Sequence, residues 1–236
     1  MFTAVIVEPR LHKALELVLL NFNKNLDEQW SFLIFHGNNN KEFISNIIEK
    51  NKIKREVRLV STRKDNLTID QYNLLFYSPD FYKHITTDMF LVFQTDTLIS
   101  DKHAANIYNY LEYDYVGAPW GGKKTEYESI GNGGFSLRKK SKMLELIKNG
   151  GYIKPDGKPH YEDRFFSDTC GNRNTIRLNK PSFKIAKQFS VETIFNTNSI
   201  GIHKPWAYLR PEHIKLLKNT FFDIEKLIHL QDVFKK

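Results

Sequence analysis

The sequence has one cysteine, Cys170, no long apolar run, and no basic segment ahead of its first apolar stretch. A single cysteine excludes an internal disulfide framework. No run approaches the roughly 18–20 apolar residues that span a bilayer, so we expect no transmembrane helix. The short apolar stretch at residues 2–7 does not match a secretory signal. These absences predict a cytoplasmic protein whose fold is stabilised by a hydrophobic core.

The overall composition is that of a folded protein. Of the 236 residues, 41% are hydrophobic and 26% are charged, which excludes an intrinsically disordered chain. The length fits one large domain. We expect a single domain over residues 1–236, because no repeat or low-complexity linker divides it.

The net charge of +8, from 35 Lys and Arg against 27 Asp and Glu, raises the hypothesis of a nucleic-acid partner. The lysines are scattered, however, and the chain is rich in Asn and Ile, as expected from the AT-rich coding sequence of a microbe or a large DNA virus. The nearest approach to a basic cluster is Lys139, Lys140 and Lys142, a pattern typical of the exposed side of a helix. Nucleic-acid binding calls for clustered basic residues with interleaved aromatics, so we expect no such partner.

The first hundred residues alternate between strand and helix patterns. Apolar runs at residues 2–7, 30–35 and 57–60 predict strands, and stripes at helical spacing between them predict two helices. This alternation predicts an α/β fold with a mixed, mostly parallel sheet flanked by helices. Residues 61–85 are expected to be helical or irregular. The run at 89–93 is the most apolar, so we expect it to be the central strand.

The second half has a different pattern. Residues 113–120 predict a strand that breaks into a loop, and residues 135–138 predict a strand entered through glycines. Helices are expected at about 140–148, from Tyr161 onward and over 211–234. Residues 201–206 are expected to form a turn.

Gln94-Thr95-Asp96 follows the expected central strand directly. Ligands of open α/β sheets gather at the carboxyl ends of the strands. Gln94 and Asp96 would share one face of an extended segment, and a carboxylate there could hold Mg²⁺ or Mn²⁺. The alternative is a strand-end turn whose Asp caps a helix.

Two further motifs could carry chemistry. Gly131-Asn132-Gly133-Gly134 lets the backbone approach a ligand closely, although it is neither a P-loop nor a dinucleotide-binding fingerprint. The alternative is a flexible hairpin turn. Glu162-Asp163 could supply a general base and its helper, and the alternative is capping and dipole compensation at a helix start.

His203, within Gly-Ile-His-Lys-Pro-Trp, is a candidate metal ligand, although a buried structural histidine is commoner. Trp120 and Trp206 flank these loops and could stack on a sugar, although most tryptophans belong to the core.

The order of these motifs resembles the GT-A class of nucleotide-sugar glycosyltransferases, and more closely a small, under-characterised branch of glycosyltransferase-like domains. Gln94-Thr95-Asp96 stands at the place of the Asp-x-Asp motif of that class. Gly131 to Arg138 is similar to its sugar-binding loop and is the most specific part. Glu162-Asp163 and His203 match its late acidic pair and metal-binding histidine. The likeness covers about residues 1–210. Gln94 departs from the motif because it brings no negative charge.

The resemblance implies a hexosyltransferase-like enzyme that moves sugar from a nucleotide-diphosphate sugar, most plausibly a UDP-sugar, to a hydroxyl of a glycan, a protein or a small molecule. It implies a nucleotide-binding half at 1–100, an acceptor and donor-sugar half at 101–210, and C-terminal helices at 211–236. Mn²⁺ or Mg²⁺ would be held by Asp96 and His203. Asp163 would be the base if the transfer inverts the anomeric centre, and would orient the substrate if the transfer retains it. The residues expected to contact the donor are Val7, Glu8, Arg63, Gln94, Asp96, Trp120, Asn132, Gly133, Gly134 and Lys204.

Two other classes stay open on the sequence alone. Gln94 favours a GT-A-like module that has lost catalysis and binds glycan or nucleotide. The net charge and the 14% aromatic content favour a nucleic-acid-binding protein, whose binding would vanish with modest salt if it were non-specific.

Overall fold

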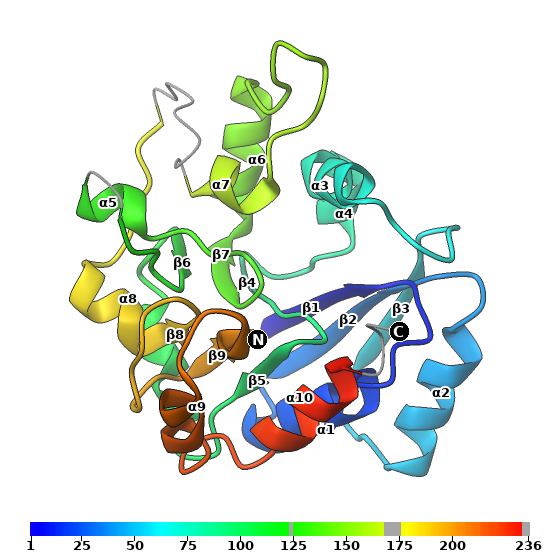
Figure 1. Cartoon of the computed structure of the whole chain (residues 1–236). Coiled ribbons are helices and arrows are strands. Elements are labelled where there is room, and N and C mark those ends of the chain that lie inside the picture. The colour runs from blue at the N-terminus through cyan, green and yellow to red at the C-terminus, as the bar shows by residue number, and fades with distance from the viewer. Residues whose placement is uncertain (123–124, 168–175, 233–236) are drawn as a thin grey trace.

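The computed structural model describes residues 1–122, 125–167 and 176–232 (Figure 1). Cys170 lies outside these residues. A six-stranded sheet has the order β3-β2-β1-β4-β7-β6, and a three-stranded sheet has the order β5-β9-β8. The strands are β1 (Phe2–Glu8), β2 (Trp30–His36), β3 (Val57–Ser61), β4 (Met89–Val92), β5 (Thr97–Ile99), β6 (Tyr115–Gly117), β7 (Ser136–Lys139), β8 (Ser190–Val191) and β9 (Gly201–His203).

Helices surround the larger sheet. None of the described helices is long and apolar enough to cross a membrane. The helices are α1 (Leu15–Asn25), α2 (Lys41–Lys50), α3 (Ile69–Tyr77), α4 (Pro79–Lys83), α5 (Glu126–Ser129), α6 (Lys140–Asn149), α7 (Glu162–Phe166), α8 (Phe183–Phe189), α9 (Pro211–Leu217) and α10 (Ile224–Asp232), with short 3₁₀ helices η1 (Ala104–Tyr110) and η2 (Pro205–Ala207).

The larger sheet is mixed and mostly parallel. β1 pairs in parallel with both β2 and β4, and β2 pairs in parallel with β3. β7 runs antiparallel to β4 and to β6. This confirms the predicted fold class, and β4 lies between β1 and β7, as its apolar sequence predicted.

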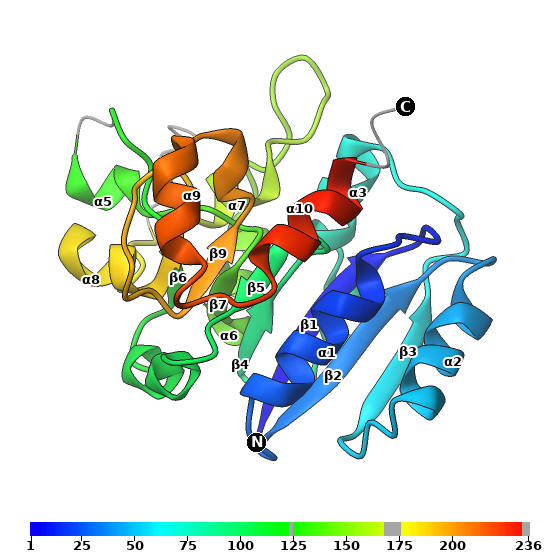
Figure 2. The same ribbon diagram turned by 60° about the horizontal axis from the view of Figure 1, so that its bottom comes forward.

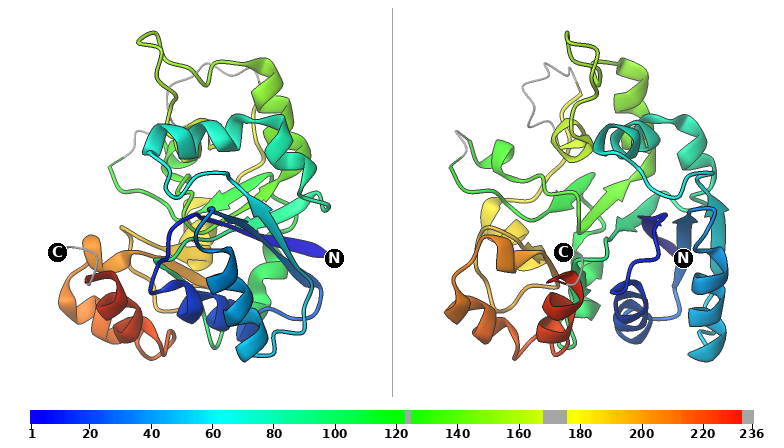
Figure 3. Two further views of the ribbon diagram at one scale, coloured as in Figure 1. Left: turned by 90° about the vertical axis from the view of Figure 1, so that its right-hand side faces the viewer. Right: turned by 45° about the vertical axis from the view of Figure 1, so that its right-hand side comes forward.

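Two core clusters cover the two faces of this sheet. On β1, Ala4 and Ile6 belong to the cluster that contains the buried side chains of α1, α2 and α10, whereas Val5 and Val7 belong to the cluster beneath α3, α4 and α6. The left view of Figure 3 shows α3 and α4 on one side of the sheet and α1 and α2 on the other, and Figure 2 shows α10 alongside α1. Burial on both faces explains why these strands are continuous apolar runs and do not alternate.

The smaller sheet was not predicted. The segment expected to be a turn at 201–206 begins with strand β9, which pairs antiparallel with β5 and parallel with β8. β5 and β8 have three and two residues, too few to show a periodic pattern. Only the long-range pairing makes them strands.

The region at 61–85 is helical over two segments. Thr68 accepts a hydrogen bond from the backbone N–H of Gln71, whose side chain accepts one from the N–H of Thr68, and this capping box starts α3. Ser78 caps α4, whose first residue is Pro79. The start of α3 matters for function because it forms one wall of a pocket.

Candidate functional site

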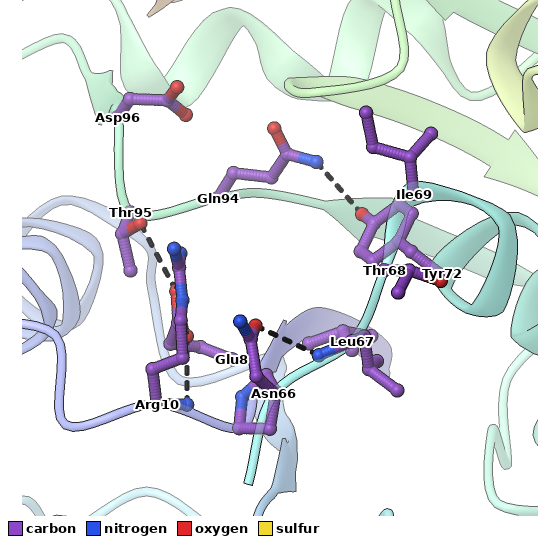
Figure 4. A pocket seen from close by; sticks show the side chains of 12 residues that line it. Glu8, Arg10, Asn66, Leu67, Thr68, Ile69, Tyr72, Gln94, Thr95 and Asp96 are labelled. Atoms are coloured by element: carbon purple, nitrogen blue, oxygen red, sulfur yellow. Dashed lines mark hydrogen bonds and ion pairs between the residues drawn. The ribbon is translucent and has the colours of Figure 1, made fainter. Parts of the chain in front are cut away.

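A pocket of about 280 Å³ opens at the carboxyl ends of β1 and β4 (Figure 4). These neighbouring parallel strands end at the same edge of the sheet, so the residues after each strand meet there. The loop before α3 and Tyr72 on α3 form the facing wall. Four of the residues predicted to contact a donor line the pocket: Val7, Glu8, Gln94 and Asp96.

Arg10 is held rigidly at the edge of this pocket. Glu8 is buried, and its carboxylate accepts hydrogen bonds from Arg10 Nε at 2.8 Å, Arg10 Nη2 at 2.7 Å and the Arg10 backbone N–H at 2.9 Å. These bonds raise the pKa of Arg10 against the opposing effect of its partial burial. The Arg10 side chain stays 47% exposed, so a pre-oriented cation borders the pocket and faces solvent.

The Gln94-Thr95-Asp96 segment forms the upper edge of the pocket in Figure 4. Gln94 Nε2 donates to the hydroxyl of Tyr72 at 2.8 Å, so one end of the amide is fixed to α3. The carbonyl of Thr95 accepts from Gln231 Nε2 on α10 at 2.6 Å. Elements from both faces of the sheet therefore hold this segment in place.

The structure brings Asp96 and His203 together. The antiparallel pair of β5 and β9 places Thr97 opposite His203, and Lys204 N–H donates to the carbonyl of Asp96 at 2.9 Å. As a result, His203 Nε2 lies 3.4 Å from Asp96 Oδ1. That carboxylate oxygen is buried and accepts no hydrogen bond from the described residues.

The other nitrogen of His203 faces a residue that the sequence analysis missed. His203 Nδ1 lies 3.0 Å from Glu192 Oε1. Burial lowers the pKa of His203, but Asp96 and Glu192 outweigh it and raise that pKa to about 10. Burial raises the pKa of Asp96, but His203 and the charge of Lys204 together outweigh burial and lower that pKa.

Glu192 also binds two predicted residues. Its Oε1 accepts from Asn132 Nδ2 at 2.8 Å, and its Oε2 accepts from Trp120 Nε1 at 2.9 Å. One pattern in the sequence could have indicated Glu192. Like Asp96, it is an acidic residue that follows the end of a strand. The two-residue length of β8 concealed it.

The glycines of the 131–134 loop allow close approach to other protein groups. A Cβ on Gly134 would lie 2.3 Å from the His203 ring, and one on Gly133 would lie 2.6 Å from Asp163 Cβ. A Cβ on Gly131 would lie 2.4 Å from Ser167 Oγ and 2.7 Å from the Trp120 ring. The loop thus passes between the His203 cluster and the start of α7.

Glu162 and Asp163 are neighbours in different environments. Glu162 is buried and forms two hydrogen bonds to the fully buried Arg138, at 2.5 Å and 3.1 Å. Asp163 is half-buried, and its Oδ1 accepts from the N–H of Arg164 at 2.7 Å. Burial and the charge of Glu162 raise the pKa of Asp163 to about 7. Glu162 therefore has a structural partner, whereas Asp163 can gain or lose a proton near neutral pH.

Two predicted contact residues lie elsewhere or are exposed. Arg63 is exposed, has a positive φ of 58°, and is not among the residues that line the pocket. Lys204 is also exposed and adopts a left-handed conformation with φ of 47°, directly after His203. In the loop that contains Arg63, Arg63 itself does not line the pocket, although Asn66 and Leu67 a few residues later do.

The donor atoms fit a divalent cation that takes further ligands from a substrate. Within the described residues, no group of three or more His, Cys, Asp and Glu side chains could hold a metal ion. Asp96 and His203 offer one oxygen and one nitrogen, and the buried Asp96 oxygen accepts no hydrogen bond from the described residues. Mg²⁺ in proteins is commonly bound by one or two carboxylates and by substrate phosphates.

A family model described as "Protein of unknown function (DUF5672)" matches residues 56–203, more than half of the chain. The chain belongs to the DUF5672 family. The segment shared with the family contains Asp96, the 131–134 loop, Asp163, Glu192 and His203, and it begins after β1 and β2. No curated protein matches the sequence.

Solved structures show what this DUF5672 protein is similar to in fold. The glycosyltransferase GlyE of Streptococcus pneumoniae TIGR4 matches with a TM-score of 0.56 and 11% identity over 99% of this chain and 64% of that chain. Its apo form matches with a TM-score of 0.55 and 12% identity over 100% and 64%. S. aureus TarS matches with a TM-score of 0.50 and 11% identity over 93% and 39%. The chain spans less than two thirds of these proteins, and the likeness confirms the GT-A-like fold.

Proposed function

We propose that the protein is a glycosyltransferase that moves a sugar from a nucleotide-diphosphate sugar, a UDP-sugar in the first instance, to a hydroxyl acceptor. The observation that carries this proposal is the pairing of Asp96 and His203 at the edge of the pocket, where a buried carboxylate oxygen lacks a hydrogen bond. The GT-A-like fold supports it. The donor would bind across two halves, 1–100 and 101–210.

The nucleoside would occupy the pocket after β1. Val7 and Glu8 line it, and Glu8 would act chiefly by orienting Arg10. The exposed part of the guanidinium would bind a phosphate of the donor, since a pre-organised Arg binds phosphate oxygens in two-pronged fashion. Arg63 is exposed and does not line the pocket, so we give it no contact in this proposal.

Asp96 and His203 would hold Mn²⁺ or Mg²⁺, with Gln94 beside them as a neutral neighbour. The cation would neutralise negative charge on the departing nucleoside diphosphate. Lys204, directly after His203, would add positive charge on the same side. Trp120 and Asn132, both bound to Glu192, would contact the sugar, with Gly133 and Gly134 allowing the loop to approach.

Asp163 would accept the proton of the acceptor hydroxyl in an inverting transfer, because a base works best when its pKa lies near the working pH. Glu162 would act as a positioning residue through Arg138. Tyr208 exposes 57% of its surface, and Glu192, Asp96 and Asp163 add to the effect of burial in raising its pKa. Its ring would form part of the acceptor side.

The test is a panel of nucleotide sugars with Mn²⁺ or Mg²⁺, read by the melting temperature and by donor hydrolysis. We expect a UDP-sugar to raise the melting temperature and to be hydrolysed in a cation-dependent way, and we expect Asp96→Asn to abolish both effects. Asp80→Asn, an exposed carboxylate on α4, is the matched control. The proposal is wrong if no nucleotide sugar stabilises the protein and Asp96→Asn changes nothing.

One observation favours a second function, a GT-A-like module that binds nucleotide or glycan without catalysis. Gln94 carries no charge, and its amide nitrogen is bound to Tyr72, so the cation would receive less electrostatic support than from two acids. Ligand binding without turnover, unchanged in Asp163→Asn, would favour this module over the enzyme.

A further inference from the structure

Glu192 joins three segments of the candidate site through one buried carboxylate. Its side chain is about 6% exposed. Its Oε1 accepts from Asn132 and faces His203 Nδ1, while its Oε2 accepts from Trp120. The three partners come from the loop after β6, the glycine-rich loop before β7 and strand β9. The first two segments lie on the proposed sugar side, and strand β9 lies on the proposed cation side.

The arrangement requires a carboxylate and not merely a polar residue. Three N–H groups point at two oxygens, and a Gln in this place would turn an amide N–H₂ toward at least one of them. Among the described residues, His203 is the one ion-pair partner of Glu192. The buried Glu162, by contrast, is neutralised by Arg138. The charge of Glu192 is thus balanced by the same histidine that faces Asp96.

We propose that Glu192 couples occupancy of the cation site to the position of Trp120 and Asn132, so that cation and donor sugar bind cooperatively. This inference rests on the proposed function. With Nδ1 donating to Glu192, the neutral imidazole of His203 presents the lone pair of Nε2 to the cation. A metal-bound imidazole donates more strongly from its other nitrogen, and such carboxylate partners tune metal affinity. His203 and Asn132 share Glu192 Oε1 as their acceptor. A stronger hydrogen bond from His203 therefore weakens the one from Asn132.

The coupling is reciprocal. If the cation favours the sugar-binding arrangement of Trp120 and Asn132, a bound sugar must raise the cation affinity by the same factor. Coupling of this kind is typically about 5–150-fold. We therefore expect Mg²⁺ to bind more tightly with the best UDP-sugar of the panel than with UDP, and this difference to disappear in Glu192→Gln.

The three tryptophans provide a direct readout that needs no turnover. Each gives one indole N–H signal in a ¹H–¹⁵N spectrum, and Trp120→Phe identifies the signal of Trp120. Adding Mg²⁺ to the UDP-bound protein should shift the Trp120 signal. Trp30 is an internal control because its indole N–H donates to Tyr108, away from this network. In Glu192→Gln the Trp120 shift should vanish, and the Mg²⁺ affinity should fall by about 10–100-fold.

A second variant keeps the carboxylate of Glu192 and is expected to change the Mg²⁺ affinity in the opposite direction. Trp120→Phe removes one donor to Glu192, which leaves the carboxylate a better acceptor for His203 and should tighten Mg²⁺ binding severalfold. Glu212→Gln, an exposed carboxylate on α9, should change neither quantity. The inference is overturned if Trp120 fails to respond to Mg²⁺ in the unmodified protein, or responds equally in Glu192→Gln. If the coupling fails in this way but the donor is still turned over, the proposed function stands and only the coupling is rejected. If the coupling is observed but no donor is turned over, the coupling stands and the catalytic function is rejected.

Discussion

The two sides of the 131–134 loop both hold buried carboxylates, but their charges are balanced differently. On the Gly133 side, Glu162 is bound by Arg138, whose guanidinium also donates to Ser136 Oγ and the carbonyl of Gly133. On the Gly134 side, Asp96 Oδ1 lies 3.4 Å from His203 Nε2 but is buried without a hydrogen bond. A closed pair stabilises the fold, whereas an unsatisfied buried oxygen is a place for a ligand.

Asp163 lies on the Gly133 side, next to Glu162 in sequence, and forms no ion pair with an arginine among the described residues. Burial and the charge of Glu162 raise its pKa to about 7. The same Arg138 that neutralises Glu162 therefore leaves its neighbour poorly compensated. The comparison predicts that replacing Asp163 lowers activity without lowering stability, whereas breaking the pair of Glu162 with Arg138 lowers stability.

The largest effect is expected from Asp163→Asn. Loss of a general base should lower the turnover of transfer by about 10²–10⁴-fold. The free energy of unfolding at pH 8 should not fall, because the folded protein disfavours the charged form of this carboxyl. Steady-state kinetics and urea denaturation measure the two quantities. A variant that keeps more than a tenth of the turnover would remove Asp163 from the reaction.

On the closed side, Arg138→Leu should lower the free energy of unfolding by about 3–5 kcal/mol, because it leaves Glu162 buried and unpaired. Replacing both partners by Leu should recover much of that loss. Lys83→Met, which breaks the exposed pair with Asp80, should cost at most about 1 kcal/mol. If Arg138→Leu and Lys83→Met proved equal in urea denaturation, the two ion pairs would not differ as proposed.

The pH dependence of turnover should follow Asp163. Below its folded pKa of about 7, turnover should rise about tenfold per pH unit, and above it should level off. The stability has the opposite slope. Because the folded pKa is raised from 3.8, this carboxyl stabilises the fold fully below pH 3.8, and the contribution is lost as the pH rises through about 7. Asp163→Asn should remove both slopes, and their persistence would point to another group.

The smallest expected effects come from alanine substitutions at Gly133 and Gly134, which should differ in Mn²⁺ affinity. Gly134→Ala and Gly133→Ala should each cost about 1–3 kcal/mol of stability, because the added Cβ meets His203 or Asp163. Only Gly134→Ala should also weaken Mn²⁺ binding, since it displaces His203. Gly121→Ala, whose Cβ would be 3.5 Å from Ile194, serves as the control. Equal losses of Mn²⁺ affinity in all three variants would contradict this division.

Local patterns predicted the strands and helices of the larger sheet well. β1, β2, β3 and β4 are apolar runs because both faces are buried, and α6 begins where the sequence predicted. The strands of the smaller sheet could not be predicted, because two or three residues show no period and become strands only by pairing. The same sheet brings His203 beside Asp96, so the proposed cation site depended on an unpredicted element.

Candidate residues were found where residue chemistry alone suggested them, and missed where only packing gives them a role. Asp96, His203 and Asp163 stood out as acids or a histidine beside glycine-rich or strand-end segments. Glu192 and Tyr72 did not, because their importance lies in the hydrogen bonds to Asn132 and Gln94. Glu162 was predicted as the helper of the base Asp163, and only the structure shows that Glu162 is bound by the buried Arg138.

The sequence by itself determined that this protein is an α/β chain with a mostly parallel sheet, because hydrophobic periodicity reports which faces are buried. With one cysteine and no long apolar run, it also determined that the described core, and no internal disulfide, stabilises the fold. Tertiary structure decided which of the polar residues form closed pairs, as Glu162 and Arg138 do, and which we propose for ligand binding. That decision depends on contacts between residues as distant as Asp96 and His203, since charge balance in a buried site is a property of the neighbours in space.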